Sequence, residues 1–229
     1  MLQALKASNT KVENTKGIMT ITVLNKEDES KSVISGYVAF APPDKMSFSY
    51  IGPLGMIFFA AIRNGDKIVF YLPQQRRAYI GNIDDMKSGP INNSFSIAPF
   101  FGPVYETSFV EHDGPISFLY GLKKVEEGWE ISEKLKIDRQ NMRILERRVF
   151  TDGVEALRVA NLEYLEIDGI SIPILISIKN FEKGEVVNKI KIGLKKVELN
   201  KTLNPSVFDT DVDDSWVVDG IENFKLPQF

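Results

Sequence analysis

The sequence predicts a mainly β protein with a few short helices, built as a meander of antiparallel hairpins. Two observations predict this fold class. Most apolar segments alternate with period two, as half-buried strands do. Turn dipeptides separate these segments at Asn64-Gly65, Asp113-Gly114, Asp152-Gly153, Asp168-Gly169 and Lys183-Gly184.

The clearest strand is predicted at Ser171 to Lys179, where isoleucines occupy every second position. Its partner is Val186 to Leu199, in which Ile190, Ile192 and Leu194 share one face. The apolar pattern then changes parity, because Val197 and Leu199 continue it. This change predicts a β-bulge near Lys195 and Lys196, which lets a long strand bend.

The remaining strands are predicted from the same alternation. They are Gly17 to Asn25, Lys31 to Ala41, Met46 to Ile51, Met56 to Ile62, Lys67 to Leu72, Ile116 to Val125, Trp129 to Ile137, Met142 to Phe150 and Glu155 to Ile167. Leu2, Leu5 and Val12 indicate a short N-terminal helix, and the irregular stretch Ile83 to Phe109 predicts short helices packed on one sheet face. No linker or internal repeat divides the chain, so we expect one domain over residues 1–229.

Composition excludes several classes of protein and site. With 43% hydrophobic and 26% charged residues the chain is too apolar to be disordered. A net charge of −3 gives no overall attraction to nucleic acid, and the absence of cysteine removes disulfides, thiolate nucleophiles and cysteine-ligated metals. No export signal is visible between Leu2 and Lys16, and the longest apolar run, Met56 to Ile62, is too short to span a bilayer.

Residues that could carry chemistry are sparse, so we expect no enzyme, no metal and no cofactor. His112, the single histidine, lies in Glu111-His112-Asp113-Gly114, which is typical of an exposed turn. The acidic run Asp209 to Asp214 lacks the glycine and glutamate of a calcium loop and is interpreted as a solvated loop. An enzyme that uses His112 remains the alternative of that class.

Basic residues could form a positive strip on neighbouring strands. They are Arg147, Arg148, Lys189, Lys191, Lys195 and Lys196. Solvated outer faces of strands usually have this composition, so it is a weak signal for contact with nucleic acid or with lipid headgroups.

Two features point to an apolar partner. The strand Lys67 to Leu72 is apolar on both faces, so helices, a second sheet or a bound apolar molecule must cover the second face. The turn Gly52-Pro53-Leu54-Gly55 places a leucine at a hairpin tip, where polar residues are usual. Leu54 either folds back onto the protein or forms an exposed apolar protrusion that contacts a membrane or a lipid chain.

Several motifs follow one another over nearly the whole chain. They are Gly17 to Leu24, Gly36 to Phe40 followed by Pro42-Pro43-Asp44-Lys45-Met46, Gly65 to Ile68, Tyr71-Leu72-Pro73, Ile167 to Pro173, and Leu203-Asn204-Pro205-Ser206-Val207-Phe208. Their order resembles that of the bacterial lipoprotein-localisation proteins, the LolA/LolB-like family. The chain departs from the family where the carrier has a lid-holding arginine, since Lys45 stands here, and it lacks the acceptor's N-terminal lipidated cysteine.

The resemblance implies an incomplete antiparallel β-barrel, or half-barrel, with a helical lid over a cavity for acyl chains. It implies no chemical step and no cofactor. The implied partners are lipoprotein acyl chains or another lipid, with peripheral contact to the outer membrane and no nucleic acid, and the implied location is the periplasm. Pro53, Leu54 and Gly55 match the acceptor's protruding loop, whose leucine promotes delivery to the membrane.

The expected ligand-lining residues are aromatic. They are Phe40, Phe48, Tyr50, Phe58, Phe70, Phe95, Phe100 and Phe101. A shift of one residue in strand register would turn each of these side chains to the opposite face of the sheet. That these residues face the ligand is therefore an expectation. The main alternative is an envelope interaction or assembly module, in which the same half-barrel is filled by its own side chains.

Overall fold

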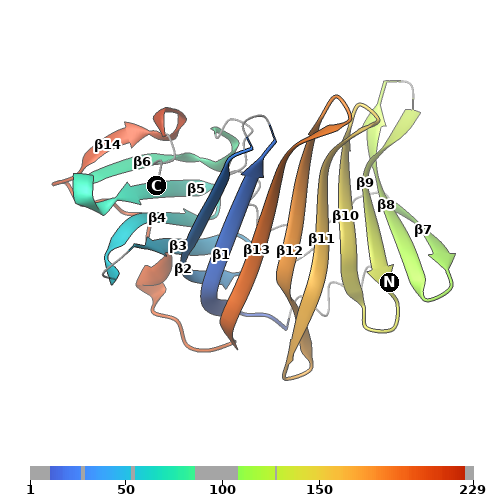
Figure 1. Cartoon of the computed structure of the whole chain (residues 1–229), viewed down its shortest axis with the longest axis horizontal. Coiled ribbons are helices and arrows are strands. Elements are labelled where there is room, and N and C mark those ends of the chain that lie inside the picture. The colour runs from blue at the N-terminus through green and yellow to red at the C-terminus, as the bar shows by residue number, and fades with distance from the viewer. Residues whose placement is uncertain (1–10, 27–28, 53–54, 86–107, 127, 225–229) are drawn as a thin grey trace. The chain divides into compact units, whose positions relative to one another are not determined.

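The computed structural model describes residues 11–26, 29–52, 55–85, 108–126 and 128–224. Fourteen strands among these residues are hydrogen-bonded in the order β14-β6-β5-β4-β3-β2-β1-β13-β12-β11-β10-β9-β8-β7 (Figure 1). The end strands β14 and β7 are not neighbours, so the sheet is open. This confirms the mainly β fold class.

Packing divides the chain into two compact units that are not continuous in sequence. Unit 1 takes its described residues from 22–31 and 108–193, together with Lys11, and unit 2 takes residues 12–21, 32–85 and 194–224. The sequence predicts one domain, and each unit is described by itself below.

Unit 2 contains the N-terminal strands and one strand from the C-terminal segment. The strands are β1 (Thr15–Asn25), β2 (Lys31–Ala41), β3 (Lys45–Ile51), β4 (Ile57–Asn64), β5 (Lys67–Leu72), β6 (Arg77–Asn82) and β14 (Val217–Gly220). The end of β1 after Ile21 and the first residue of β2, Lys31, belong to unit 1. Strands β2 to β6 pair antiparallel, whereas β14 pairs parallel to β6. The expectation of a wholly antiparallel sheet is therefore wrong at this edge, because β14 is reached by a long connection rather than a hairpin.

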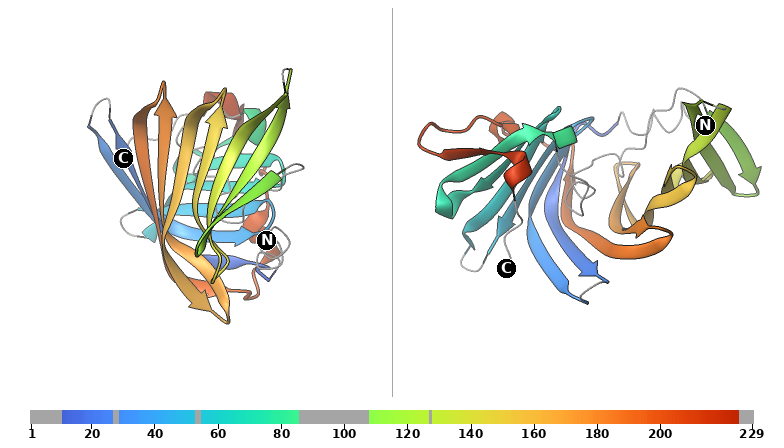
Figure 2. Two further views of the ribbon diagram at one scale, coloured as in Figure 1. Left: turned by 90° about the vertical axis from the view of Figure 1, so that its right-hand side faces the viewer. Right: turned by 90° about the horizontal axis from the view of Figure 1, so that it is seen from above.

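Unit 1 is a run of long antiparallel hairpins. Its strands are β7 (Ser108–Asp113), β8 (Ile116–Val125), β9 (Gly128–Asp138), β10 (Arg143–Thr151), β11 (Val154–Ile167), β12 (Ile170–Glu182) and β13 (Glu185–Leu199), the last of which continues into unit 2. These strands lie side by side and twist along their length (Figure 2).

The turn dipeptides act as predicted. Asp152-Gly153, Asp168-Gly169 and Lys183-Gly184 each form a two-residue hairpin in which both residues have positive φ, between 50° and 83°. This is the type I′ geometry, whose twist matches that of the flanking strands. These dipeptides therefore set the register of β10 to β13.

The predicted bulge in β13 is confirmed. Lys196 has a φ of 51°, and the buried positions change from Ile190, Ile192 and Leu194 to Leu199. Gly17 of β1 faces the bulge, where an added Cβ would lie 2.9 Å from the carbonyl oxygen of Lys195. A glycine is therefore required in β1 at this close approach.

The helical predictions differ from the structure. The described residues contain no α-helix and only short 3₁₀ turns: η2 (Pro73–Gln75), η3 (Ile83–Asp85), η4 (Pro205–Phe208) and η5 (Ile221–Asn223). Leu2, Leu5 and most of the predicted lid, residues 86–107, lie outside the described residues, so a helical lid is not shown. Ser108 and Phe109, counted as irregular, begin β7, and His112 lies in that strand rather than in a turn.

Candidate functional site

An aromatic surface covers one face of the unit 2 sheet. Phe48 lies opposite Val38 and Ala61, and Phe70 lies opposite Ala61 and Tyr79, so these side chains form one row across β2 to β6. Phe40, Phe48, Phe59 and Phe70 are each 3% exposed or less. The alternation within β2 to β5 and the pairing of these strands place all four on the same face.

Ring stacking organises this surface, which we call the aromatic face. The Phe59 and Phe70 rings are stacked with centroids 5.6 Å apart. Phe224 stacks on Phe70 at 4.2 Å with an interplanar angle of 5°, and on Phe59 at 5.8 Å. Tyr79 meets Phe224 edge-on at 5.3 Å. Phe224 therefore closes the aromatic face over three rings at once.

Phe224 reaches this face at the end of a segment that wraps the edge of the sheet. This C-terminal strap, residues 203–224, begins on the opposite face, where the Tyr71 hydroxyl donates to the carbonyl oxygen of Asp211 at 3.1 Å and the Tyr71 ring packs against Trp216. The strap then forms β14 along β6, with an Arg77–Asp219 ion pair at 3.4 Å. Burial and the nearby Asp209 and Asp211 raise the pKa of Tyr71.

The last turn of the strap is anchored next to Phe224. Ile221 is buried against Gly81, where an added Cβ would lie 2.2 Å from an Ile221 methyl group. The Phe224 N–H donates to the Ile221 carbonyl at 3.0 Å, while the Phe224 side chain is only half-buried. Ile221, which anchors the strap, is thus more deeply buried than the Phe224 ring that it helps to position.

The structure places the predicted ligand-lining residues in three groups. Phe40, Phe48 and Phe70 lie on the aromatic face, and Tyr50 joins it through its pairing with Phe59. Phe58 lies beside Tyr50, with ring centroids 6.1 Å apart, at a register shift in β4. Phe95, Phe100 and Phe101 lie outside the described residues.

Sequence reasoning missed Phe59 and Phe224. Two adjacent phenylalanines, Phe58 and Phe59, lie in Ile57–Asn64, and the sequence does not show which of them points toward the aromatic face. The register shift after Tyr50 places Phe59 on that face. In the structure, buried Phe59 and Ala61 alternate with less buried neighbours, and the register Phe48 to Ala61 puts Phe59 on the same face as Phe48. No local pattern identifies Phe224, because its role depends on the path of the strap.

The predicted transfer loop is only partly described. Pro53 and Leu54 lie outside the described residues, whereas Gly55 is exposed with a φ of 75°. Gly52 N–H donates to the Met56 carbonyl at 3.0 Å, which closes the turn. Met56 and Ile57 are 50% and 44% exposed, so apolar side chains follow the turn at the surface.

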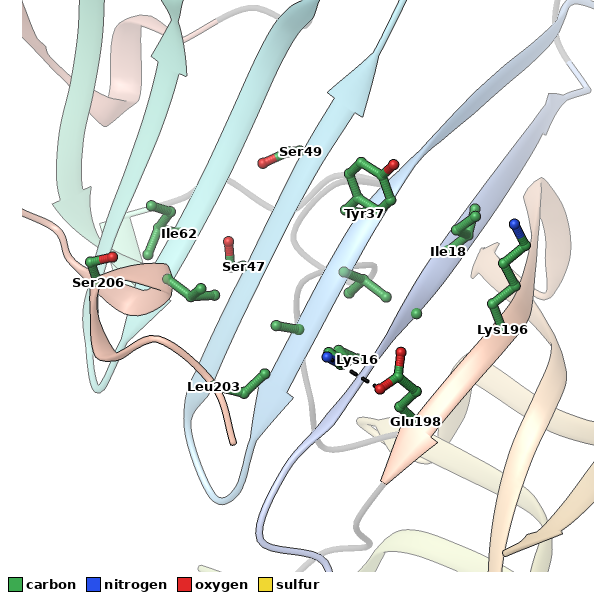
Figure 3. A pocket seen from close by; sticks show the side chains of 14 residues that line it. Lys16, Ile18, Tyr37, Ser47, Ser49, Ile62, Lys196, Glu198, Leu203 and Ser206 are labelled. Atoms are coloured by element: carbon green, nitrogen blue, oxygen red, sulfur yellow. Dashed lines mark ion pairs between the residues drawn. The ribbon is translucent and has the colours of Figure 1, made fainter. Parts of the chain in front are cut away.

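A pocket of about 620 Å³ lies on the opposite face of the same sheet (Figure 3). Tyr37, Ser47, Ser49 and Ile62 form its floor from alternate positions of β2, β3 and β4, and the strap contributes a wall. The Lys16 Nζ to Glu198 Oε2 ion pair, at 3.2 Å, lies at one side. The pocket contains none of the predicted ligand-lining residues, and its hydroxyls and charges make it more polar than the aromatic face.

The described residues offer little support for a catalytic site or a metal site. His112 is exposed, and its Nδ1 lies 2.7 Å from Ser117 Oγ, the residue directly opposite in β8. The described residues contain no group of three acidic or histidine side chains placed to hold a metal ion. The predicted absence of an enzymatic activity remains an expectation.

Comparison with solved structures identifies the fold. A domain described as an outer membrane lipoprotein-sorting protein from Vibrio parahaemolyticus superposes with a TM-score of 0.68 at 11% identity, covering 91% of this chain and 94% of that one. A LolA superfamily protein from Nitrosomonas europaea gives 0.63 at 12% identity, covering 90% and 96%. The chain has the LolA-superfamily fold. The resemblance predicted from motif order is thereby confirmed as a likeness of fold.

The LolA-like fold extends to a further group of proteins. A DUF1329 family protein from Desulfovibrio piger superposes with a TM-score of 0.60 at 11% identity, covering 91% of this chain and 97% of that one. No protein-family model matches the chain, and no curated protein matches it by sequence. None of the helices in the described part of the chain is long and apolar enough to cross a membrane.

Proposed function

We propose that this protein binds and transfers a hydrophobic ligand, either lipoprotein acyl chains or another lipid, in the bacterial cell envelope, without a chemical step. The observation that carries the proposal is the aromatic face of unit 2 and its closure by Phe224. The LolA-like fold supports it, because one solved neighbour is described as a lipoprotein-sorting protein. A periplasmic location and contact with the outer membrane through Pro53, Leu54 and Gly55 belong to the same proposal.

The energetics favour exchange of Phe224 for an acyl chain. Each buried methylene contributes about 0.8 kcal/mol, so a chain of roughly 14 methylenes offers on the order of 11 kcal/mol before ordering costs. Lifting Phe224 costs about 0.5–1.5 kcal/mol for a ring pair in addition to roughly 2 kcal/mol of lost burial. The gross gain exceeds the cost of lifting the ring by roughly 8 kcal/mol, from which the ordering costs of the ligand are still to be subtracted.

The test is the affinity of the purified protein for a fluorescent fatty-acid probe. Phe224→Ala removes the competing ring, so we expect the probe to bind about a hundredfold more tightly, which corresponds to about 2.8 kcal/mol. Phe109→Ala is the matched control, because Phe109 stacks on Tyr120 at 4.5 Å in unit 1 and should not change the affinity. Unchanged or weaker binding by the Phe224 variant would reject the proposal.

The second candidate is an envelope assembly module, and the almost complete burial of the aromatic face favours it. In this function the face is filled permanently by side chains such as Phe224, and a partner protein binds elsewhere. Native mass spectrometry after gentle purification separates the two candidates. A carrier retains or accepts acylated material, whereas a self-filled half-barrel does not.

A further inference from the structure

A row of basic residues crosses five strands on one face of unit 1. Lys134 of β9 lies opposite Arg148 of β10, and Arg148 lies opposite Arg158 of β11. Arg158 lies opposite Lys179 of β12, which lies opposite Lys189 of β13. Adjacent strands are about 4.8 Å apart, so the five cations form one closely spaced line.

This arrangement is unfavourable for a sheet in water. Like charges directly opposite each other on neighbouring strands destabilise the pair, and here four such pairs follow in succession. A solvated face needs polar side chains but not aligned charges of one sign. Departures from such a local rule are expected at functional or strained sites.

Carboxylates of the same sheet neutralise the cations of this row only in part. Arg148 Nε donates to Glu146 at 2.7 Å, and Arg158 donates to both carboxylate oxygens of Glu155 at 2.6 and 2.7 Å. The hydrogen bond from Arg158, with the nearby charges of Arg158, Arg148 and Lys179, lowers the pKa of Glu155. Thus two carboxylates serve the arginines, while the lysines of the row make no ion pair within the described residues.

The next row on the same face extends the positive charge. It contains Lys136, Glu146, Ala160, Ser177 and Lys191 across the same strands. The two rows together carry seven cations, against the carboxylates of Glu146 and Glu155. The whole chain has a net charge of −3, so this excess is local. The positively charged area ends at Asp138 and at the Arg143–Glu166 ion pair on the same face.

Aromatic rings continue the basic row at its β8 end. Tyr120 lies opposite Lys134, and Phe109 lies opposite Tyr120. The Lys134 Nζ is 4.3 Å from the Phe118 ring centroid and 4.9 Å from that of Tyr120. Phe109 is 47% exposed although it stacks on Tyr120. Exposed rings beside lysines are typical of surfaces that lie at the headgroup level of a membrane.

We propose that this basic face of unit 1 binds the anionic lipid headgroups of a membrane surface. The headgroup phosphates would supply ion-pair partners for Lys179, Lys189 and Lys191, which make no ion pair within the described residues. The choice of a bilayer over nucleic acid rests on the proposed function, because a carrier of lipid must meet a membrane to load or release. The acyl chain and the headgroups contact different residues, so the two sites are tested separately.

The test is co-sedimentation of the intact protein with vesicles. Vesicles of phosphatidylglycerol and phosphatidylcholine should bind the protein at low salt, whereas pure phosphatidylcholine vesicles should not. The double variant Lys179→Glu and Lys189→Glu should reduce binding at least about tenfold. Its thermal midpoint should stay close to that of the wild type, since the Lys179–Lys189 repulsion becomes a Glu–Glu repulsion of similar size while position 179 becomes attractive toward Arg158.

A control with the same change of net charge is Lys45→Glu with Lys201→Glu, two exposed lysines of unit 2. This control should keep the vesicle affinity within about twofold, because local rather than net charge is proposed to act. Equal loss in the control, or failure of the wild type to bind anionic vesicles, would overturn the inference. Binding of duplex DNA in place of vesicles, lost in the double variant, would also overturn it and assign the face to nucleic acid.

These outcomes are independent of the acyl site. The double charge variant should keep the affinity for the fatty-acid probe, and Phe224→Ala should keep the affinity for anionic vesicles. Failure of the headgroup proposal with intact probe binding leaves the carrier function standing. Failure of probe binding with intact vesicle binding leaves a peripheral membrane protein without the proposed cargo.

Discussion

The two units bury apolar faces of different character. Unit 2 buries aromatic rings, among them Phe48, Phe59 and Phe70, whereas unit 1 buries branched aliphatic side chains such as Ile178 and Ile190. A β-branched side chain has a strongly preferred rotamer and interlocks with its neighbours, while a flat ring can exchange one stacked partner for another. Under the proposed function, the aromatic face would be the surface where ligand and ring exchange, and unit 1 would be its fixed scaffold.

The largest expected effect comes from truncating the centre of the aromatic face. Phe70→Ala should lower the free energy of unfolding by about 3–5 kcal/mol, because it removes a fully buried ring that contacts Phe59 and Phe224. Ile178→Val in unit 1 is the matched change and should cost about 0.5–1.5 kcal/mol. Urea unfolding followed by circular dichroism measures both. A loss of less than about 1 kcal/mol for Phe70→Ala would indicate that the face is loosely filled.

The second prediction concerns a charged pair within the aliphatic face. Arg147 donates to Glu133, and their side chains are only 16% and 8% exposed. Arg147→Met should cost about 3 kcal/mol, because it leaves the Glu133 carboxylate buried without its partner. The double variant with Glu133→Leu should recover most of that loss in the same unfolding experiment. Equal stability of the single and double variants would contradict a buried pair.

The smallest expected effect concerns Tyr164, which ties β11 to a bulge in β10. The Ile144 carbonyl lies at the register shift of β10 and accepts from the Tyr164 hydroxyl at 2.5 Å and from Asn161 Nδ2 at 2.6 Å. Tyr164→Phe should therefore cost about 1 kcal/mol at neutral pH, measured by urea unfolding.

The pH dependence of the same residue has a definite sign. Burial raises the pKa of Tyr164 to about 12 from its ordinary value of 10.0. The folded state therefore holds this proton more tightly than the unfolded chain. The resulting stability is complete below pH 10 and is lost as the pH rises toward 12. The wild type should lose more stability over this range than Tyr164→Phe, and parallel curves would contradict the assignment.

Much of the fold could be predicted from local sequence. The Asp-Gly and Lys-Gly dipeptides specify their hairpins, and the parity change before Val197 specifies the bulge. The short strands β6 and β14 could not be predicted, since six and four residues carry too little alternation. β14 forms because the strap passes the β6 edge, which is a tertiary event.

The candidate sites depend on register, which local patterns specify poorly. Phe40, Phe48 and Phe70 could be named from their aromatic character, but the choice between Phe58 and Phe59 required the pairing of β3 with β4. The basic residues could likewise be named from the sequence, but their alignment into a row could not be predicted. Arg147 lies on the face opposite Arg148 in an ion pair, and Lys196 lines the pocket of unit 2. Aligning Lys134 with Lys189 requires the register of five strands.

The two ends of the open sheet are protected against strand addition by different means. β7 presents the exposed and mostly charged residues Glu111, His112 and Asp113, which discourage pairing with another chain. β6 is instead covered by the parallel strand β14. Any truncation that removes β14 would bare hydrogen-bonding groups beside Ala78 and Tyr79 and turn that edge into a template for a second molecule. Self-association of such a shortened protein would then grow from one end of the sheet only.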